Sequence, residues 1–366
     1  ILLGLVGSEM CIRDRLLFSR NCYMDKTHHK YIERTFYLAK KGLGNVKQNP
    51  LVGCVIVKDN KIIGEGYHKK YGKEHAEINA IKSVTNKKEI KGSSIYVNLE
   101  PCSHYGKTPP CTLEIIKHKP KEVIIANKDP NKKVNGRGID SLRENGINVI
   151  EGIKRKEGEN LNKRFFTNQN KKRPYVILKW AQTIDGFIAR KNGDSRWISN
   201  GLSRKFVHKW RSEEDGICVG INTVLIDNPK LNVRKWKGDN PLRIIINPNL
   251  KSLKNKKVIN DELLSLIINQ VESSSCSGKE FYKTKNLSFK KVLDILYKKG
   301  ISSLLVEGGA KTLNNIIQEN IWDEARVFTG SNKFDEGIKA PSFKLPEHFQ
   351  NIDKDKLYTI YNNGRN

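Results

Sequence analysis

The sequence predicts an α/β protein made of two domains. Its 366 residues exceed one typical domain and can bury a core without disulfides. Strand and helix patterns alternate along both halves, which favours a three-layer first domain whose sheet is parallel in one half. A polar stretch rich in Lys, Asn and Glu over residues 151–173 separates the halves and is expected to form a helix followed by a linker at 168–173. We therefore expect domains at residues 24–170 and 171–366.

The first domain is expected to begin with an amphipathic helix over residues 30–41, because its apolar residues recur at helical spacing before Gly42. Two apolar runs at residues 51–57 and 62–67 flank the turn sequence KDNK and predict a hairpin. Alternating patterns then predict a helix at 74–84, a strand at 94–99, a helix at 111–118, a strand at 122–126, a helix at 139–145 and a strand at 147–150.

The second domain is expected to open with an apolar strand at residues 174–180. Residues 250–290 carry no clear pattern, so no element is assigned there. The remaining expected elements are a helix at 202–211, strands at 216–219 and 242–246, a helix at 289–299, a strand at 303–306, a helix at 311–319 and a strand at 324–328.

The formal net charge is +28, from 67 Lys and Arg against 39 Asp and Glu. Only 17 of the basic residues are Arg, which reads phosphate groups better than Lys does. The excess is divided evenly, with 29 basic and 16 acidic residues in 24–170 and 35 and 21 in 171–366. Neither half has a long basic block, so we interpret the charge as a lysine-rich solvated surface and expect no nucleic-acid partner.

The chain is expected to work in the cytoplasm. Its seven cysteines are scattered and odd in number, and the sequence shows no signal-peptide pattern. Both observations indicate a reducing compartment. No run of about 18 apolar residues exists, so we expect no membrane span. Residues 1–15 resemble read-through of a sequencing adaptor, and we leave residues 1–23 out of the fold as non-native or disordered. Cys54 and Cys218 lie in apolar runs and are expected to be buried.

A histidine and two cysteines give the strongest chemical signal. His75-Ala76-Glu77 is followed by Pro101-Cys102 and by Cys111. One imidazole and two thiolates leave the fourth position of a tetrahedral zinc ion open, and zinc makes hydroxide available there at neutral pH. This order of residues is the signature of zinc deaminases, in which the Glu moves protons and is not a ligand. We predict that His75, Cys102 and Cys111 bind one Zn²⁺ and that Glu77 is catalytic.

Four other interpretations of this motif remain open at this point. His104 could complete a closed, structural zinc site, or the residues could be unrelated to a metal. A tRNA or nucleoside deaminase with an accessory basic domain would share the motif, but such enzymes usually have Cys-x-x-Cys, and here Ser103–Pro110 separates the cysteines. A zinc-stabilised RNA-binding protein without catalysis is the interpretation furthest from an enzyme.

The second half contains the sequence Val306–Ala310 (VEGGA), a buried strand pattern that leads into paired glycines and a helix. Such a turn directs backbone N–H groups and a helix N-terminus toward an anion. A plain tight turn would leave the same pattern. No Gly-x-Gly-x-x-Gly sequence follows a strand, so a classical dinucleotide-binding fold is not supported.

Several longer blocks resemble the bifunctional deaminase/reductase family of riboflavin biosynthesis. In the first half these are Asn49–Gly53 (NPLVG), the His75–Glu77 motif and Leu99–Cys111 (LEPCSHYGKTPPC). The second half resembles the reductase domain of that family in the blocks KWAQTIDG at 179–186, SRWI at 195–198 and TVLIDNPKLNVR at 223–234. The resemblance implies a cytidine-deaminase-like first domain and a second domain like dihydrofolate reductase.

The same resemblance implies the reactions and their ligands. Zinc-dependent hydrolytic deamination of 2,5-diamino-6-(phosphoribosylamino)pyrimidinone would be followed by NADPH-dependent reduction of the ribosyl group to ribityl. Whether the chain forms a homo-oligomer is left open by the sequence. The substrate contacts implied in the first domain are Asn49, His68 and Lys107, and in the second Ser195, Arg211, Leu231, Arg234 and Glu307. The NADPH contacts implied are Ala181, Trp197, Thr223, Asp227, Gly309, Ala310, Lys311, Thr312, Leu313, Asn314 and Asn315.

Overall fold

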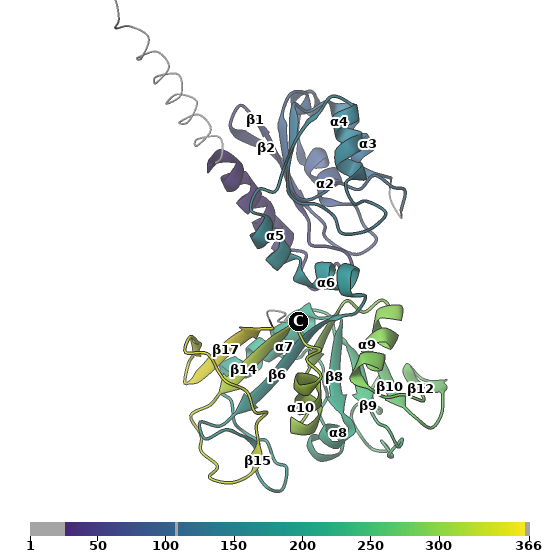
Figure 1. Cartoon of the computed structure of the whole chain (residues 1–366), viewed down its shortest axis with the longest axis vertical. Helices are drawn as coiled ribbons and strands as arrows, with labels where there is room; N and C mark the ends of the chain where they lie inside the picture. The colour runs from purple at the N-terminus through teal and green to yellow at the C-terminus, as the bar shows by residue number, and fades with distance from the viewer. Residues whose placement is uncertain (1–25, 107–108, 363–366) are drawn as a thin grey trace, which may run out of the picture. The chain divides into compact units, whose positions relative to one another are not determined.

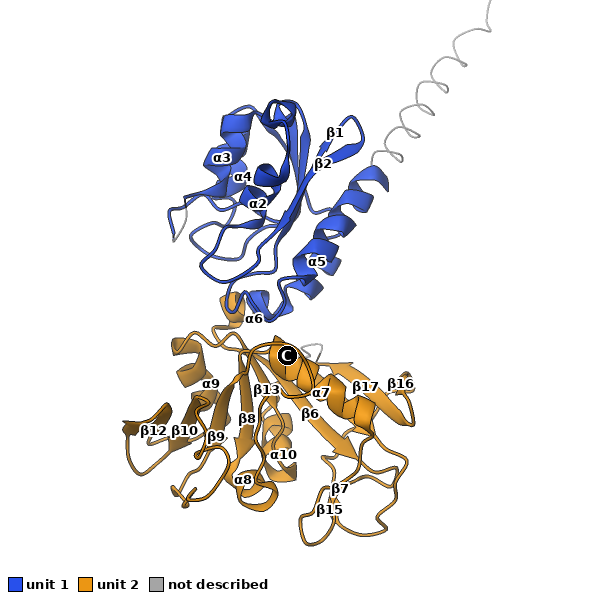
Figure 2. Cartoon of the chain, turned by 180° about the vertical axis from the view of Figure 1, so that it is seen from behind, with its two compact units in different colours: residues 1–166 blue, residues 167–366 orange. Residues whose placement is uncertain are grey.

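A computed structural model describes residues 26–106 and 109–362 of the chain (Figure 1). It divides into two compact units, residues 1–166 and 167–366 (Figure 2). The division falls inside helix α6 (Lys163–Lys171). Because this helix runs to Lys171, the prediction of a linker at 168–173 is wrong for its first four residues. The expected non-native segment 1–23 lies outside the described residues. Among the described residues, none of the helices combines the length and the apolar composition needed to cross a bilayer.

Unit 1 is built on a five-stranded sheet in the order β2-β1-β3-β4-β5. Strand β1 pairs antiparallel with β2 and β3, whereas β3, β4 and β5 are parallel, which confirms the expected mixed sheet. The antiparallel part comes from the predicted hairpin, and the parallel part from strands joined through helices. The strands are β1 (Gly53–Lys58), β2 (Lys61–Tyr67), β3 (Ser94–Leu99), β4 (Glu122–Asn127) and β5 (Asn148–Glu151).

Helices cover both faces of this sheet because side chains alternate along each strand. Cys54 and Ile56 of β1 pack in the core beneath α2 (Ala76–Ser83), α3 (Cys111–His118) and α4 (Arg137–Glu144). Val55 and Val57 point the other way, toward a helix over residues 26–40 and toward Leu161 of α5 (Arg155–Leu161). A short 3₁₀ helix, η1 (Lys87–Ile90), precedes β3.

Unit 2 contains a ten-stranded sheet in the order β11-β12-β10-β9-β8-β13-β6-β14-β17-β16. The strands from β12 to β14 in this order are parallel to their neighbours, and β11, β17 and β16 pair antiparallel at the two edges. A separate pair joins β7 (Phe187–Ala189) to β15 (Ile338–Lys339). The large sheet consists of β6 (Tyr175–Gln182), β8 (Gly216–Gly220), β9 (Leu242–Ile246), β10 (Ser265–Asn269), β11 (Ser274–Cys276), β12 (Lys279–Lys283), β13 (Ser303–Val306), β14 (Glu324–Thr329), β16 (Gln350–Ile352) and β17 (Asp355–Tyr361).

Two helices pack on each face of the large sheet. One core joins α7 (Gly201–Glu213) to β6, β13 and β14, and a neighbouring core on this face holds α8 (Ile221–Asp227). The opposite face is covered by α9 (Phe289–Lys298) and α10 (Ala310–Gln318). Helix α7 begins where the Asn200 side chain accepts a hydrogen bond from the Ser203 N–H, an N-cap. Cys54 and Cys218 are buried, as expected.

Residues 250–290, left without elements above, contain β10, β11 and β12. Strand β11 (SSC) lies at the edge of the sheet and is exposed, and most side chains of its neighbour β12 (KEFYK) are only half-buried, so neither sequence shows apolar alternation. The neighbouring strand β9 has the predicted bounds, 242–246, and contains an inward-facing charge. Arg243 is completely buried there, and its guanidinium pairs with Asp261 at 2.6 and 2.7 Å.

Replacing Asp261 with Ala is expected to lower the free energy of unfolding of unit 2 by about 3–5 kcal/mol. The buried Arg243 charge would keep carbonyl acceptors at Val258 and Leu263 but lose its only carboxylate partner among the described residues. Asp239→Ala removes an exposed carboxylate and is the matched control. Denaturant unfolding measures both variants, and equal stability of the two would contradict a role for this ion pair.

Candidate functional site

Three side chains of unit 1 converge in the arrangement that a zinc ion requires. His75 is the N-cap residue of α2, Cys111 is the first residue of α3, and Cys102 follows β3. The Nδ1 atom of His75 lies 3.5 Å from the Cys102 Sγ and 3.3 Å from the Cys111 Sγ. The three ligand atoms all lie within 4.8 Å of one another, so one tetrahedral ion can contact all of them.

The segment that carries Cys102 is held by the buried carboxylate of Glu100. This carboxylate accepts hydrogen bonds from the backbone N–H groups of Asp129, Gly136 and Gly138 at distances of 2.9–3.1 Å. These donors lie in the loop after β4 and at the start of α4. Glu100 therefore ties the end of β3 to its parallel neighbour and fixes where Cys102 enters the site.

Glu77 lies beside the ligands in the first turn of α2. Its side chain is almost fully buried, and burial raises the pKa of its carboxyl to about 7. Its Oε2 has no hydrogen-bond partner among the described residues. A buried carboxyl with a free oxygen next to an open metal position can accept and return a proton.

The structure does not support a closed zinc site. His104 is not part of the ligand cluster formed by the described residues, and its buried Nδ1 has no hydrogen-bond partner among them. Hydrogen bonds from Cys111 and His75 lower the pKa of the Cys102 thiol, which favours a thiolate. The fourth position of the ion is therefore left without a protein ligand from the described part of the chain.

Asn49 and His68, the expected pyrimidine contacts, lie together near the metal ligands. The Nδ2 atom of Asn49 is 3.0 Å from Nε2 of His68, and Nδ1 of His68 is 2.9 Å from the carbonyl oxygen of Glu74. The ring of His68 stands edge-on to the ring of His75, with centroids 5.5 Å apart. Burial lowers the pKa of His68, so the ring is neutral and its Nδ1–H donates to Glu74. Lys107 lies outside the described residues.

Replacing Cys102 with Ala is expected to weaken zinc binding by more than about 100-fold. Loss of a residue that only hydrogen-bonds to a metal ligand already lowers metal affinity by about 10- to 100-fold. Ammonia release should disappear with the metal. Cys276→Ala removes an exposed thiol elsewhere and is the matched control. The measurement compares the zinc content of the two purified variants. A full zinc content in Cys102→Ala would exclude Cys102 as a ligand.

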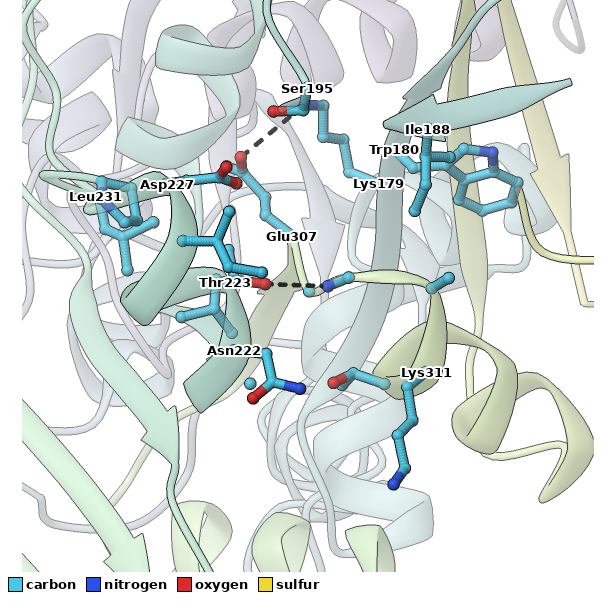
Figure 3. Close-up of a pocket in the computed structure, with 18 of the residues that line it drawn as sticks. Lys179, Trp180, Ile188, Ser195, Asn222, Thr223, Asp227, Leu231, Glu307 and Lys311 are labelled. Carbon is cyan, nitrogen blue, oxygen red and sulfur yellow. Dashed lines mark hydrogen bonds and ion pairs between the residues drawn. The ribbon is translucent and has the colours of Figure 1, made fainter. Parts of the chain in front are cut away.

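Unit 2 contains a cavity of about 910 Å³ at the carboxyl ends of its parallel strands (Figure 3). Residues at or just beyond the ends of β6, β8, β9 and β13 line it. Ligands of open α/β sheets bind at this edge because the loops there diverge and leave a crevice. The volume lies near the upper end of ligand pockets, so the cavity has room for two ligands side by side.

Most of the residues that the sequence assigned to the second domain line this cavity, but two of the eleven cofactor contacts do not. Leu313 is completely buried in the core between α10 and the sheet, and Asn314 is not among the lining residues. The helical period of α10 explains this, because successive positions point to different faces. The predicted residues that do line the cavity are Ala181, Ser195, Trp197, Arg211, Thr223, Asp227, Leu231, Arg234, Glu307, Gly309, Ala310, Lys311, Thr312 and Asn315.

A buried carboxylate and two cations form the charged centre of the cavity. The Glu307 carboxylate receives a bidentate pair from Arg211 at 2.8 and 2.9 Å. The Nζ of Lys179 lies 3.8 Å from the same carboxylate (Figure 3). Burial alone would raise the pKa of Glu307, but the charges of Arg211 and Lys179 hold it at about 2. Glu307 is therefore ionised at neutral pH.

The strand-to-helix turn after β13 has the expected form. The Gly309 N–H donates to Oγ1 of Thr223 at 3.2 Å, and α10 begins at the next residue (Figure 3). A Cβ atom on Gly308 would lie 2.9 Å from Cβ of Thr312, so a side chain there would displace the first turn of α10. The N–H groups of this turn are thus presented to the cavity.

Lys179, Arg204 and His208 are among the lining residues that sequence reasoning missed. Lys179 pairs with Glu307, and Arg204 and His208 project into the cavity from α7. The spacing of Arg204, His208 and Arg211 places all three on one helical face, a signal that the sequence did contain. Lys179 carried no such signal, because its partner lies on a different strand.

Comparison with known proteins matches both units to known families. Residues 174–333 match the family model "RibD C-terminal domain", and residues 25–127 match "Cytidine and deoxycytidylate deaminase zinc-binding region". Riboflavin biosynthesis protein RibD of Aquifex aeolicus is 40% identical over 84% of this chain and 88% of its own length. The protein of the same name from Actinobacillus pleuropneumoniae is 38% identical over 91% of each chain.

A solved structure agrees with these relatives. The diaminohydroxyphosphoribosylaminopyrimidine deaminase/5-amino-6-(5-phosphoribosylamino)uracil reductase of Thermotoga maritima is 37% identical to this chain, with a TM-score of 0.85. The match covers 92% of this chain and 99% of that one. Similarity of this extent spans the deaminase and reductase units alike. The chain therefore belongs to the RibD family, the bifunctional deaminases and reductases of riboflavin biosynthesis.

Proposed function

We propose that unit 1 hydrolyses the amino group of 2,5-diamino-6-(phosphoribosylamino)pyrimidinone and that unit 2 then reduces the ribosyl group of the product to ribityl with NADPH. The observation that carries this proposal is the buried Glu77 carboxyl beside three converging zinc ligands, His75, Cys102 and Cys111. A nitrogen leaving group needs a proton, and Glu77 is placed to deliver one.

In unit 1, His75, Cys102 and Cys111 would hold one zinc ion. Zinc supplies the Lewis acidity that makes hydroxide available at neutral pH. Glu77 would accept one proton of the attacking water and pass it to the ring nitrogen, and would then move the second proton, from the new hydroxyl group, to the amino group, which departs as ammonia. The Asn49–His68 pair would hold the pyrimidine by hydrogen bonds, which is supported by the polar atoms that both side chains offer beside His75. From the family resemblance we assign Lys107 to the sugar phosphate.

In unit 2, the cavity would hold NADPH and the sugar substrate together. The cofactor supplies the hydride, and the protein orients the two ligands and excludes water. The N-terminal turn of α10, from Gly309 to Thr312, would bind the cofactor phosphates, with Asn315 one turn further along, and Ala181, Trp197, Thr223 and Asp227 would contact the rest of the cofactor. Ser195, Arg211, Leu231, Arg234 and Glu307 would contact the substrate. Free cysteines throughout the described residues fit a reducing cytoplasm.

The test supplies the purified chain with the phosphoribosyl diaminopyrimidinone, with and without NADPH. Ammonia should appear in both cases, whereas ribityl product and NADPH oxidation should require the cofactor. The purified chain is expected to carry out both steps without another protein, because both units lie in one chain. Ammonia release from a tRNA anticodon stem, with none from the pyrimidine, would replace this proposal with a nucleic-acid deaminase.

A further inference from the structure

The backbone of Leu51, just before β1, is bound by a side chain from the far end of unit 1. The Oδ1 atom of Asn162 accepts a hydrogen bond from the Leu51 N–H at 2.8 Å, and its Nδ2 donates to the Leu51 carbonyl oxygen at 3.0 Å. Asn162 is the residue at which α5 ends, 111 positions further along the chain, and its side chain is buried. One carboxamide therefore satisfies both backbone groups of Leu51.

A second buried carboxamide, from β3, binds the same segment. Asn98 is completely buried, its Nδ2 donates to the Leu51 carbonyl oxygen at 2.8 Å, and its Oδ1 accepts from the Gly53 N–H at 2.7 Å. A Cβ atom on Gly53 would lie 2.1 Å from the carbonyl oxygen of Thr35, so the backbone also packs closely against the helix over residues 26–40. Buried backbone groups need partners, and these amides supply them in one position of the segment only.

This segment carries both side chains that we assign to the pyrimidine. Asn49 lies two positions before Leu51 in the chain. The backbone N–H of His68 donates to the carbonyl oxygen of Val52 at 2.9 Å, so the segment also holds His68. A displacement of Leu51 would therefore move Asn49 and His68 together, whereas the side chain of Asn162 makes no hydrogen bond to a zinc ligand among the described residues.

We propose that Asn162 is a positioning residue of the deaminase site. By holding Leu51 it sets the places of Asn49 and His68, and through them the affinity of unit 1 for the pyrimidine. The region that matches the zinc-binding deaminase family ends at residue 127, so this contribution comes from a part of unit 1 beyond that region. The inference rests on the function proposed for unit 1, because it takes the pyrimidine as the ligand of Asn49 and His68.

The test compares Asn162→Ala with the wild type, as full chains, by following ammonia release over a range of concentrations of the phosphoribosyl diaminopyrimidinone. KM should rise about 10-fold, the scale of one lost hydrogen bond. The value of kcat should stay within about twofold, because the weakened contacts hold the substrate and the transition state alike. Zinc content should be unchanged. Asn162→Ser keeps a hydroxyl group, should raise KM by less, and decides the question if Asn162→Ala does not fold.

A double variant shows whether Asn162 acts through Asn49. Asn49→Ala alone should raise KM, since it removes one proposed contact to the pyrimidine. Adding Asn162→Ala to it should raise KM by a smaller factor than Asn162→Ala does alone, because residues that act through one another are not additive. Full additivity of the two substitutions would overturn the proposal.

Asn145→Ala is the matched control, since Asn145 likewise ends a helix of unit 1, α4, but its exposed side chain donates only to the Ser141 carbonyl oxygen. Its kinetics should equal those of the wild type. An unchanged KM in a folded Asn162 variant would overturn the proposal, and so would a fall in kcat with loss of zinc in both variants. Failure of the wild type to release ammonia from the pyrimidine would instead refute the function proposed for unit 1.

Discussion

Glu77→Gln is expected to lower the rate of ammonia release by about 10²- to 10⁴-fold, the usual contribution of a general acid–base residue. Glutamine has nearly the same shape but cannot accept the proton of the attacking water. Because the side chain is almost fully buried, bulk water cannot easily take its place. Reduction of substrate that is already deaminated should be unchanged, since that reaction takes place in unit 2.

The measurement follows ammonia release and NADPH oxidation on the same preparation, with zinc content determined in parallel. Glu89→Gln, which removes an exposed carboxylate from η1, is the matched control and should behave as the wild type. Zinc should remain bound in Glu77→Gln, because this carboxylate is not part of the ligand cluster. Ammonia release near the wild-type rate would exclude Glu77 as the proton carrier.

Glu307→Gln is expected to lower the rate of NADPH oxidation by about 100-fold, the scale of a small misplacement of substrate. A neutral amide would leave Arg211 and Lys179 without the carboxylate that both face, so Arg211 would lose the bidentate pair that orients it. Breaking a buried pair on one side also costs about 3–5 kcal/mol of unfolding free energy. Ammonia release by unit 1 should persist.

Two further variants separate chemistry from stability at this position. Glu307→Asp keeps the charge and should retain more stability than Glu307→Gln, whereas Glu347→Gln removes an exposed carboxylate and should change neither property. Wild-type stability should also depend on pH. Because the pKa of Glu307 is about 2 in the fold, its contribution is complete above the unfolded value of about 4.3 and is lost as the pH falls toward 2. Identical acid unfolding of wild type and Glu307→Gln would contradict the ion pair.

The zinc site could be predicted from sequence because its residues are few and their types are demanding. His75 and Glu77 are two positions apart, and Cys102 and Cys111 bound a single loop, so local geometry already brings each pair together. Glu100 could not be predicted as their support. Its partners are backbone N–H groups of residues 129–139, and a backbone donor leaves no trace in the sequence.

The centre of unit 2 was less accessible to sequence reasoning. Arg211 and Glu307 are 96 positions apart, and Lys179 lies on another strand, so only the parallel sheet brings the three together. The strand β9 was predicted, but the burial of Arg243 within it was not, because a charge can occupy a core only once a partner such as Asp261 pairs with it. Leu313 was predicted to contact the cofactor but lies in the core, because membership in a sequence motif does not say which face of a helix a residue occupies.

The sequence by itself predicted the α/β class, the mixed sheet of unit 1 and the candidate zinc ligands, because periodicity and residue types at short spacing are properties of the chain in one dimension. The family came from the resemblance of longer sequence blocks, which the comparisons then confirmed. Only the tertiary structure decided the open fourth metal position, the buried Glu307–Arg211 pair and the hydrogen bonds between Asn162 and Leu51. Each depends on burial and on contacts between segments far apart in the chain, because the strength of a charge or a hydrogen bond is set by its surroundings after folding.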